Sequence, residues 1–122
     1  MSKVIAERLF RTREGTRVVA RIHAPEKIDQ SSEWSCKVEV QGSEAPFAKL
    51  SIGVDSFQAL CSALRLLCAH LDRISASLIF LDGEAGECDT PLIMPWTFGP
   101  SLKVEVHRLI EERIKDELDA RR

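Results

Sequence analysis

The chain contains no tyrosine, no Cys-x-x-Cys pair and no long apolar run, although hydrophobic residues make up 44% of it. A membrane-spanning helix needs roughly 20 consecutive apolar residues, so the sequence predicts a protein without a membrane span. The missing Cys-x-x-Cys spacing argues against thioredoxin-like redox chemistry and against a zinc ribbon. Glu7 and Arg8 place charges where a signal peptide needs an apolar run, which indicates a cytoplasmic protein.

Residue patterns that support catalysis or metal binding are also missing. The three histidines lie in different predicted elements, without the short spacings of metal ligands. The acidic residues between 82 and 89 do not match the spacing of a calcium-binding EF-hand loop. Cys61 and Cys68 fall on an apolar helical stripe and are expected in the core, whereas Cys88 lies in a polar loop and is expected to be exposed or half-buried. We therefore expect no catalytic residue, no bound metal and no cofactor.

Length and charge set the remaining limits. The 122 residues fit one domain covering 1–122, and the net charge of −2 is too small to imply a polyanionic partner. The charge is uneven along the chain: residues 1–37 carry eight basic and five acidic side chains, whereas residues 38–100 carry three and eight. Such an asymmetry can help to orient a protein partner.

Alternating apolar and polar residues predict four strands, at 4–11, 17–23, 34–41 and 47–54. Short links between them favour an antiparallel meander. The third strand is expected to turn Trp34, Cys36, Val38 and Val40 toward the core. The fourth is expected to turn inward its apolar residues Ala48, Leu50, Ile52 and Val54.

A helix from Phe57 to Ile74 follows, because apolar residues recur there at intervals of three and four, and Asp55 or Ser56 offers an N-cap. Residues 77–81 form a short apolar run, 82–100 a long connection, and Pro100 opens a final amphipathic helix. The predicted fold class is α+β with the order ββββ-α-β-α. It is a four-stranded antiparallel meander packed against one long helix, with a short fifth extended segment and a C-terminal amphipathic helix.

Two neighbouring stretches are candidate partner-binding residues. The 82–89 loop is acidic, and acidic surfaces accelerate docking onto cationic partners. The 91–98 segment carries large apolar side chains of the kind enriched at interfaces, or else covers an open edge of the core. The candidate residues are Glu84, Glu87, Asp89, Met94, Trp96 and Phe98.

A second candidate surface is a modest basic face on the outer side of the sheet. It would consist of Arg17, Arg21, Lys37 and Lys49. Nucleic-acid binding requires more charge and interleaved aromatic residues, so we expect a solvated face here.

The segment Gly53-Val54-Asp55-Ser56-Phe57-Gln58-Ala59-Leu60 resembles the strand-to-helix signature of a family of short bacterial proteins known only as a domain of unknown function. The similarity extends over most of the chain, from Glu7-Arg8 through Ala24-Pro25 and Trp34. It implies a bacterial cytoplasmic protein and supplies no substrate, cofactor or catalytic residue.

Three functional hypotheses follow. The first is a non-catalytic protein-binding module, by analogy in fold and size with bacterial immunity or accessory proteins. The second is a small-molecule-binding domain or enzyme with a pocket between the sheet and the 82–100 loop. The third is a structural homodimer formed through an edge strand or the C-terminal helix.

Overall fold

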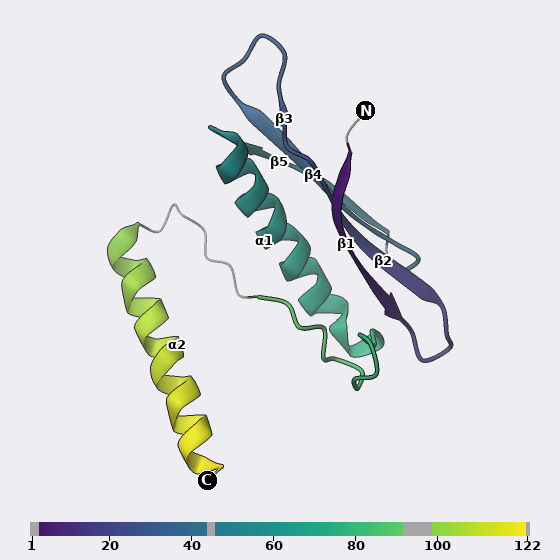
Figure 1. The fold of residues 1–122 in the computed structure, drawn as a ribbon, viewed down its shortest axis with the longest axis vertical. Coiled ribbons are helices and arrows are strands. Elements are labelled where there is room, and N and C mark those ends of the chain that lie inside the picture. The colour runs from purple at the N-terminus through teal and green to yellow at the C-terminus, as the bar shows by residue number, and fades with distance from the viewer. Residues whose placement is uncertain (1–2, 44–45, 92–98, 122) are drawn as a thin grey trace.

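The computed structural model describes residues 3–43, 46–91 and 99–121. They form a five-stranded antiparallel sheet, a long helix on one of its faces and a second long helix apart from both (Figure 1). The elements are β1 (Val4–Arg11), β2 (Arg17–His23), β3 (Glu26–Lys27), β4 (Trp34–Gln41), β5 (Phe47–Gly53), α1 (Ser56–Ile74), a 3₁₀ turn η1 (Ser75–Ser77) and α2 (Pro100–Ala120). The predicted α+β class is confirmed.

The sheet is a meander in which β1 pairs with β2, β2 with β4, and β4 with β5. The short strand β3, which alternation did not predict, pairs with the beginning of β4. The predicted fifth extended segment is present as an isolated bridge between Arg11 and Ile79, and Leu78 beside it is 1% exposed. The four main strands therefore lie where alternation predicted them.

The prediction for the inward face of β5 was wrong. Directly paired residues of antiparallel strands share a face, and Val40, Val38 and Cys36 of the core pair with Phe47, Lys49 and Ser51. Leu50 consequently points to the outer face and is 60% exposed, as Ile52 and Val54 are also exposed.

The reason lies at Gly53, where the end of β5 meets the start of α1. A Cβ built on Gly53 would lie 2.4 Å from the backbone nitrogen of Ala59. Only glycine fits where two backbones approach so closely. The close approach fixes which side of β5 faces the helix, and strand alternation then carries Leu50 and Ile52 outward.

Helix α1 begins as predicted. Asp55 accepts a hydrogen bond from the backbone nitrogen of Gln58 (2.7 Å), and the Gln58 side chain accepts one from the backbone nitrogen of Val54 (2.7 Å). These reciprocal bonds satisfy helix-start donors, so the Gly-Val-Asp-Ser segment has a capping role. The buried face is rotated from the predicted stripe, because Ala59 and Ala63 lie against the sheet and Phe57 is 74% exposed.

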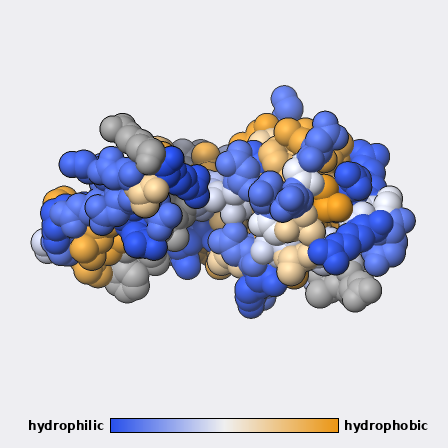
Figure 2. All heavy atoms as spheres, turned by 90° about the horizontal axis from the view of Figure 1, so that it is seen from below, coloured by the Kyte–Doolittle hydropathy of each residue, from blue (hydrophilic) through white to orange (hydrophobic). Residues whose placement is uncertain are grey.

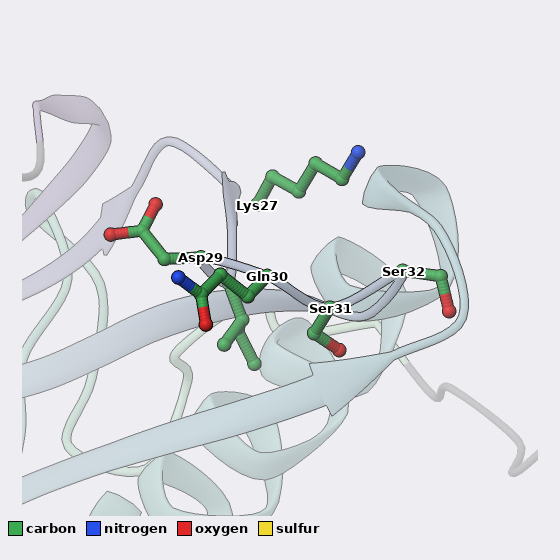
Figure 3. Close-up of a pocket in the computed structure, with 6 residues that line it drawn as sticks. Lys27, Asp29, Gln30, Ser31 and Ser32 are labelled. Atoms are coloured by element: carbon green, nitrogen blue, oxygen red, sulfur yellow. The ribbon is translucent and has the colours of Figure 1, made fainter.

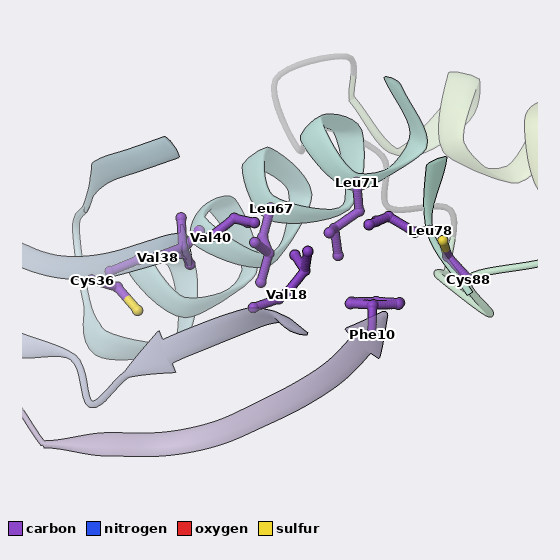
Figure 4. Packing of buried hydrophobic residues seen from close by; sticks show 12 residues of the cluster. Phe10, Val18, Cys36, Val38, Val40, Leu67, Leu71, Leu78 and Cys88 are labelled. Atoms are coloured by element: carbon purple, nitrogen blue, oxygen red, sulfur yellow. The ribbon is translucent and has the colours of Figure 1, made fainter. Parts of the chain in front are cut away.

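The core fills the space between the sheet and α1, with Leu78 and Cys88 closing one end (Figure 4). α1 packs chiefly over β4 and β5 and much less over β2. The inner face of β1 and β2 therefore extends beyond the cover of α1. Its buried members include Phe10, Val18 and Ala20.

Helix α2 begins after Gly99 with Pro100 in its first turn, as predicted. None of its described residues is buried, and Figure 1 shows it standing away from the sheet and α1. We refer to residues 3–91 as the body.

Candidate functional site: an acidic strap beside an apolar groove

After η1 the chain turns back across the end of the body, and we call residues 78–91 the strap. Its first contact is with β1, where the backbone nitrogens and oxygens of Arg11 and Ile79 exchange hydrogen bonds of 3.0 and 2.8 Å. Its side chains Leu78 and Cys88 are buried in the core. The expectation of an exposed or half-buried Cys88 was therefore wrong, because the strap turns the Cys88 side chain into the core together with Leu78 (Figure 4).

Arg8 of β1 holds the second half of the strap. Its Nη1 donates to the carbonyl oxygens of Cys88 (3.0 Å) and Asp89 (2.7 Å). The same guanidinium lies 4.4 Å from the centre of the Phe80 ring, a cation–π distance. One side chain thus joins β1 to two distant points of the strap.

A third attachment joins the strap to α1. The hydroxyl of Thr90 donates to a carboxylate oxygen of Asp72, at 2.6 Å. The strap is therefore tied to β1 near its beginning and to both β1 and α1 near its end. Because it has no regular secondary structure of its own, these contacts set its shape.

The predicted acidic residues lie on the outside of this strap. Glu84, Glu87 and Asp89 are all exposed, and a Glu87 carboxylate oxygen accepts a long hydrogen bond (3.4 Å) from the backbone nitrogen of Glu84. The structure thus brings three predicted residues together on one fixed segment. Met94, Trp96 and Phe98 lie outside the described residues.

Between the strap, β1 and α1 lies an apolar groove of about 190 Å³. It exists because α1 covers β4 and β5 rather than β1. Arg8 and Thr90 contribute polar groups to it, and Leu67 and Leu71 form part of its base. The other lining residues are Ala6, Glu7, Ala20, Ile22, Leu64, Cys68 and Pro91.

The thiols near the groove are poor nucleophiles. Burial raises the pKa of Cys68 and of Cys88, and the nearby charge of Asp72 raises both further, against a smaller opposing effect of Arg8. The pKa of Cys36 is also raised by burial. A reactive cysteine needs a lowered pKa, so these three thiols suit packing better than covalent catalysis.

His70 is a further buried titratable group. It is 8% exposed and stacks on Phe47, with 4.0 Å between the ring centres. Its Nε2 has no hydrogen-bond partner within the described part of the chain. Burial, with a contribution from Arg73, lowers the pKa of His70, which keeps the ring neutral.

The predicted basic face is smaller and less basic than expected. Lys49 pairs with Val38 and so lies on the α1 side of the sheet, not with the other three residues. Arg21 contacts Glu7 at 3.3 Å, and Arg21 and Lys37 both approach Glu39, at 3.9 and 4.0 Å. The outer face of the sheet is therefore a network of mixed charge.

A second hollow lies in the β3–β4 connection and has a volume of about 470 Å³. Its side chains project in different directions instead of converging on a common point (Figure 3). It is lined by Lys27, Ile28, Asp29, Gln30, Ser31 and Ser32. A binding site needs a few converging polar groups, so this hollow is a weaker candidate than the groove.

Arg8, Asp72 and Thr90 hold the strap but were not predicted as site residues from the sequence. Arg8 could have been found, because Ala6, Arg8 and Phe10 alternate onto the core face of β1. An arginine there must find hydrogen-bond acceptors. Asp72 and Thr90 carry no such signal, since their contact depends on the path of an irregular segment.

The described residues contain no group of three or more histidine, cysteine, aspartate or glutamate residues placed to hold a metal ion. None of their helices is apolar over a long enough stretch to cross a bilayer.

The fold and the strap define a small α+β domain with an antiparallel meander, one covering helix and an irregular acidic segment. Residues 6–91 match the model of the domain of unknown function DUF6968. The chain belongs to this family. The match spans the strands, α1 and the strap, and ends before α2. No curated protein and no solved structure matched the chain.

Proposed function

We propose that this protein is a non-catalytic protein-binding module of the immunity or accessory type, which presents the strap to a basic surface of a partner. The supporting observation is that a segment without regular structure is fixed by Arg8, Arg11 and Asp72 while its carboxylates stay in solvent. Binding residues are often carried by loops held on a rigid scaffold. A fixed loop loses less conformational freedom when it binds.

Charge supports the same proposal. Glu84, Glu87 and Asp89 are exposed on the strap, and a concentration of one charge accelerates docking onto a surface of opposite charge. The raised thiol pKa values near the groove disfavour a cysteine nucleophile. The cytoplasmic location and bacterial origin expected from the sequence would fit an immunity or accessory role.

The experiment is a quantitative affinity capture from lysate of the source cells. The bait carries Glu84→Lys and Glu87→Lys, and the control bait carries Glu14→Lys and Glu33→Lys, which change net charge equally at exposed positions away from the strap. We expect a protein captured by the wild type and the control to be depleted at least about tenfold with the strap variant, the equivalent of about 1.4 kcal/mol.

Two further measurements test whether the strap variant is still folded and whether the 91–98 segment contributes to capture. A thiol-reactive dye should label Cys88 of the strap variant as slowly as in the wild type, which establishes that the strap is still folded. Adding Trp96→Ala to the strap variant should weaken capture further if the 91–98 segment is part of the contact surface. Equal capture by the wild type and the strap variant would sink the proposal.

The groove supports a second candidate, a small-molecule-binding domain. Its lining is mostly apolar, and it lies between the sheet and the strap, where the sequence analysis placed a pocket. Its volume of about 190 Å³ is below the roughly 300–1,000 Å³ typical of ligand pockets, so it ranks second. An apolar fluorescent dye should bind the wild type and fail to bind Leu64→Trp if the groove accepts ligands.

A further inference from the structure

Helix α2 carries a ridge of apolar side chains that nothing in the body covers. Its members are spaced four residues apart and therefore follow one another along the helix surface. They are Leu102, Val106, Ile110, Ile114 and Leu118, with Leu109 beside them. Leu102, Leu109, Ile114 and Leu118 are exposed, and Val106 and Ile110 are only partly covered.

Seen from below, α2 stands at one side of the molecule and presents both hydrophilic and hydrophobic side chains (Figure 2). Burying one large apolar side chain is worth about 1.5–3 kcal/mol. An isolated helix gains little stability from propensity alone and depends on packing of an apolar face. A 21-residue helix without a buried residue would therefore be stabilised further by a surface to pack on.

The ridge is symmetric about Ile110. If two copies of α2 lie antiparallel, with Ile110 beside Ile110 and the helices inclined so that their four-residue ridges interdigitate, Leu102 comes level with Leu118 and Val106 with Ile114. Every member of the ridge then has an apolar partner. A self-complementary pattern of this kind is expected of an interface between identical chains related by a two-fold axis. A helix that packs on its own body or on an unrelated protein has no need of it.

The charges beside the ridge favour the antiparallel direction. At about 100° per residue, Lys103 and Glu117 lie along the ridge side of α2, and the antiparallel register places them opposite each other. A parallel pair would place Lys103 against Lys103 and Glu117 against Glu117. Like charges opposite each other are destabilising, and opposite charges are favourable.

The charges of the two halves of α2 also favour the antiparallel direction. Residues 100–109 carry two basic and one acidic side chain, whereas residues 111–120 carry two basic and five acidic. An antiparallel pair sets the more basic half of each helix against the more acidic half of the other. It also opposes the two helix dipoles, which is the favourable arrangement.

We propose that α2 joins two copies of this chain into a dimer, through an antiparallel helix pair centred on Ile110. This goes beyond the proposed partner binding, since the strap is not part of the helix pair. α2 follows the family-matched residues 6–91 and buries no residue, which fits an element added to the domain.

The first test is molar mass, measured by light scattering over a series of protein concentrations. The wild type should be a dimer that dissociates on dilution. Ile110→Asp should be monomeric at every concentration at which the wild type is dimeric, because each dimer would bury two facing carboxylates. A wild type that stays monomeric throughout the series would overturn the proposal.

Val104→Asp is the matched control. Val104 is an exposed apolar residue of the same helix, and it lies roughly 120° around the axis from Ile110. It receives the same substitution and should remain dimeric. Neither variant should change the melting temperature of the body, since no α2 residue is buried. A dimer that survives Ile110→Asp would place the interface elsewhere and overturn the proposal.

Disulfide formation under mild oxidation by copper–phenanthroline and oxygen tests the register. Ile110→Cys should cross-link to its own copy, and mass spectrometry should place the bond at residue 110, apart from the native cysteines. Leu118→Cys should not cross-link to itself, because sixteen residues separate it from its facing position, about 24 Å along the helix.

A mixture of the Leu102→Cys and Leu118→Cys proteins should give the mixed cross-link. A cross-link of Leu118→Cys to itself would indicate parallel helices and overturn the antiparallel arrangement. Glu84→Lys with Glu87→Lys should still dimerise, and monomeric Ile110→Asp should retain the strap. Failure of the dimer and failure of strap binding are therefore separable.

Discussion

The body buries many of its apolar residues, whereas α2 leaves its apolar residues unburied. In the body, β1, β2, β4, α1 and the strap all contribute side chains to one core, and Leu78, Val18 and Val38 are almost completely buried. α2 has a comparable share of leucine, isoleucine and valine but buries none of it. The body buries its apolar residues within itself, whereas those of α2 have no cover in the described part of the chain. The family match, which ends at residue 91, follows the same division.

The largest expected difference between the two regions is the loss of unfolding free energy when one leucine of each is replaced by alanine. Leu78→Ala should cost about 2–5 kcal/mol of unfolding free energy, because it leaves a cavity at the closed end of the core. Leu109→Ala in α2 should cost less than about 0.5 kcal/mol in the monomer, as an exposed substitution does. Urea unfolding measures both, and similar losses would contradict the division.

The next effect concerns the contact between β5 and α1. Gly53→Ala should cost about 1–3 kcal/mol, because its Cβ would press against the Ala59 backbone, which cannot move away as a side chain can. Gly83→Ala is the control, since the atoms nearest to its Cβ are at 3.1 Å and include a flexible Glu87 oxygen. Thermal unfolding should rank Gly53→Ala as clearly the less stable variant.

A smaller effect is the pH dependence of folding stability, which we expect from a residue of the body, His70. The pKa of His70 is lowered in the folded state, so at acidic pH the unfolded chain binds more protons than the folded chain. This contribution to stability is complete above the unfolded pKa of about 6.5 and is lost as the pH falls below it.

The test compares unfolding free energies at pH 8 and pH 5 in the wild type and in His70→Phe. The variant keeps an aromatic ring against Phe47 and removes the buried Nε2. Its loss of stability on acidification should be smaller than that of the wild type. Identical losses would show that His70 binds protons equally in the folded and the unfolded chain.

The smallest effect is expected from removing α2. A chain that ends before Gly99 should melt within a few degrees of the full-length protein, at a concentration too low for α2 to pair. Differential scanning calorimetry measures this, and the far-ultraviolet spectrum should lose only helical signal. A large drop in melting temperature would show that α2 supports the body.

Local sequence signals were sufficient for the four main strands and both long helices. Alternation located β1, β2, β4 and β5, and the capping residues located the start of α1. Pro100 marked the start of α2. Each of these features is encoded within a few neighbouring residues, so no knowledge of the rest of the chain is needed.

Features that depend on close contact between distant parts of the chain were predicted wrongly. Hydrophobicity favoured Leu50 and Ile52 as inward residues, whereas Gly53 and Ala59 occupy the contact because they are small. The buried position of Cys88 in an acidic loop depends on contacts with β1, some 80 residues earlier. Of the candidate site, the acidic residues could be predicted and Arg8 could have been found from its place on β1, but Asp72 and Thr90 could not.

The strap also makes the two ends of the family-matched region depend on each other. Arg8 and Arg11 of β1 bond to residues 79–89, whereas α1 packs chiefly over the later strands β4 and β5. Proteins open in cooperative units that follow such contacts. We expect β1 and residues 78–91 to exchange amide hydrogens together, and earlier than the hairpin of β4 and β5 beneath α1. A cut or mutation in either partner of this unit would then expose the other to proteases while the rest of the domain stays folded.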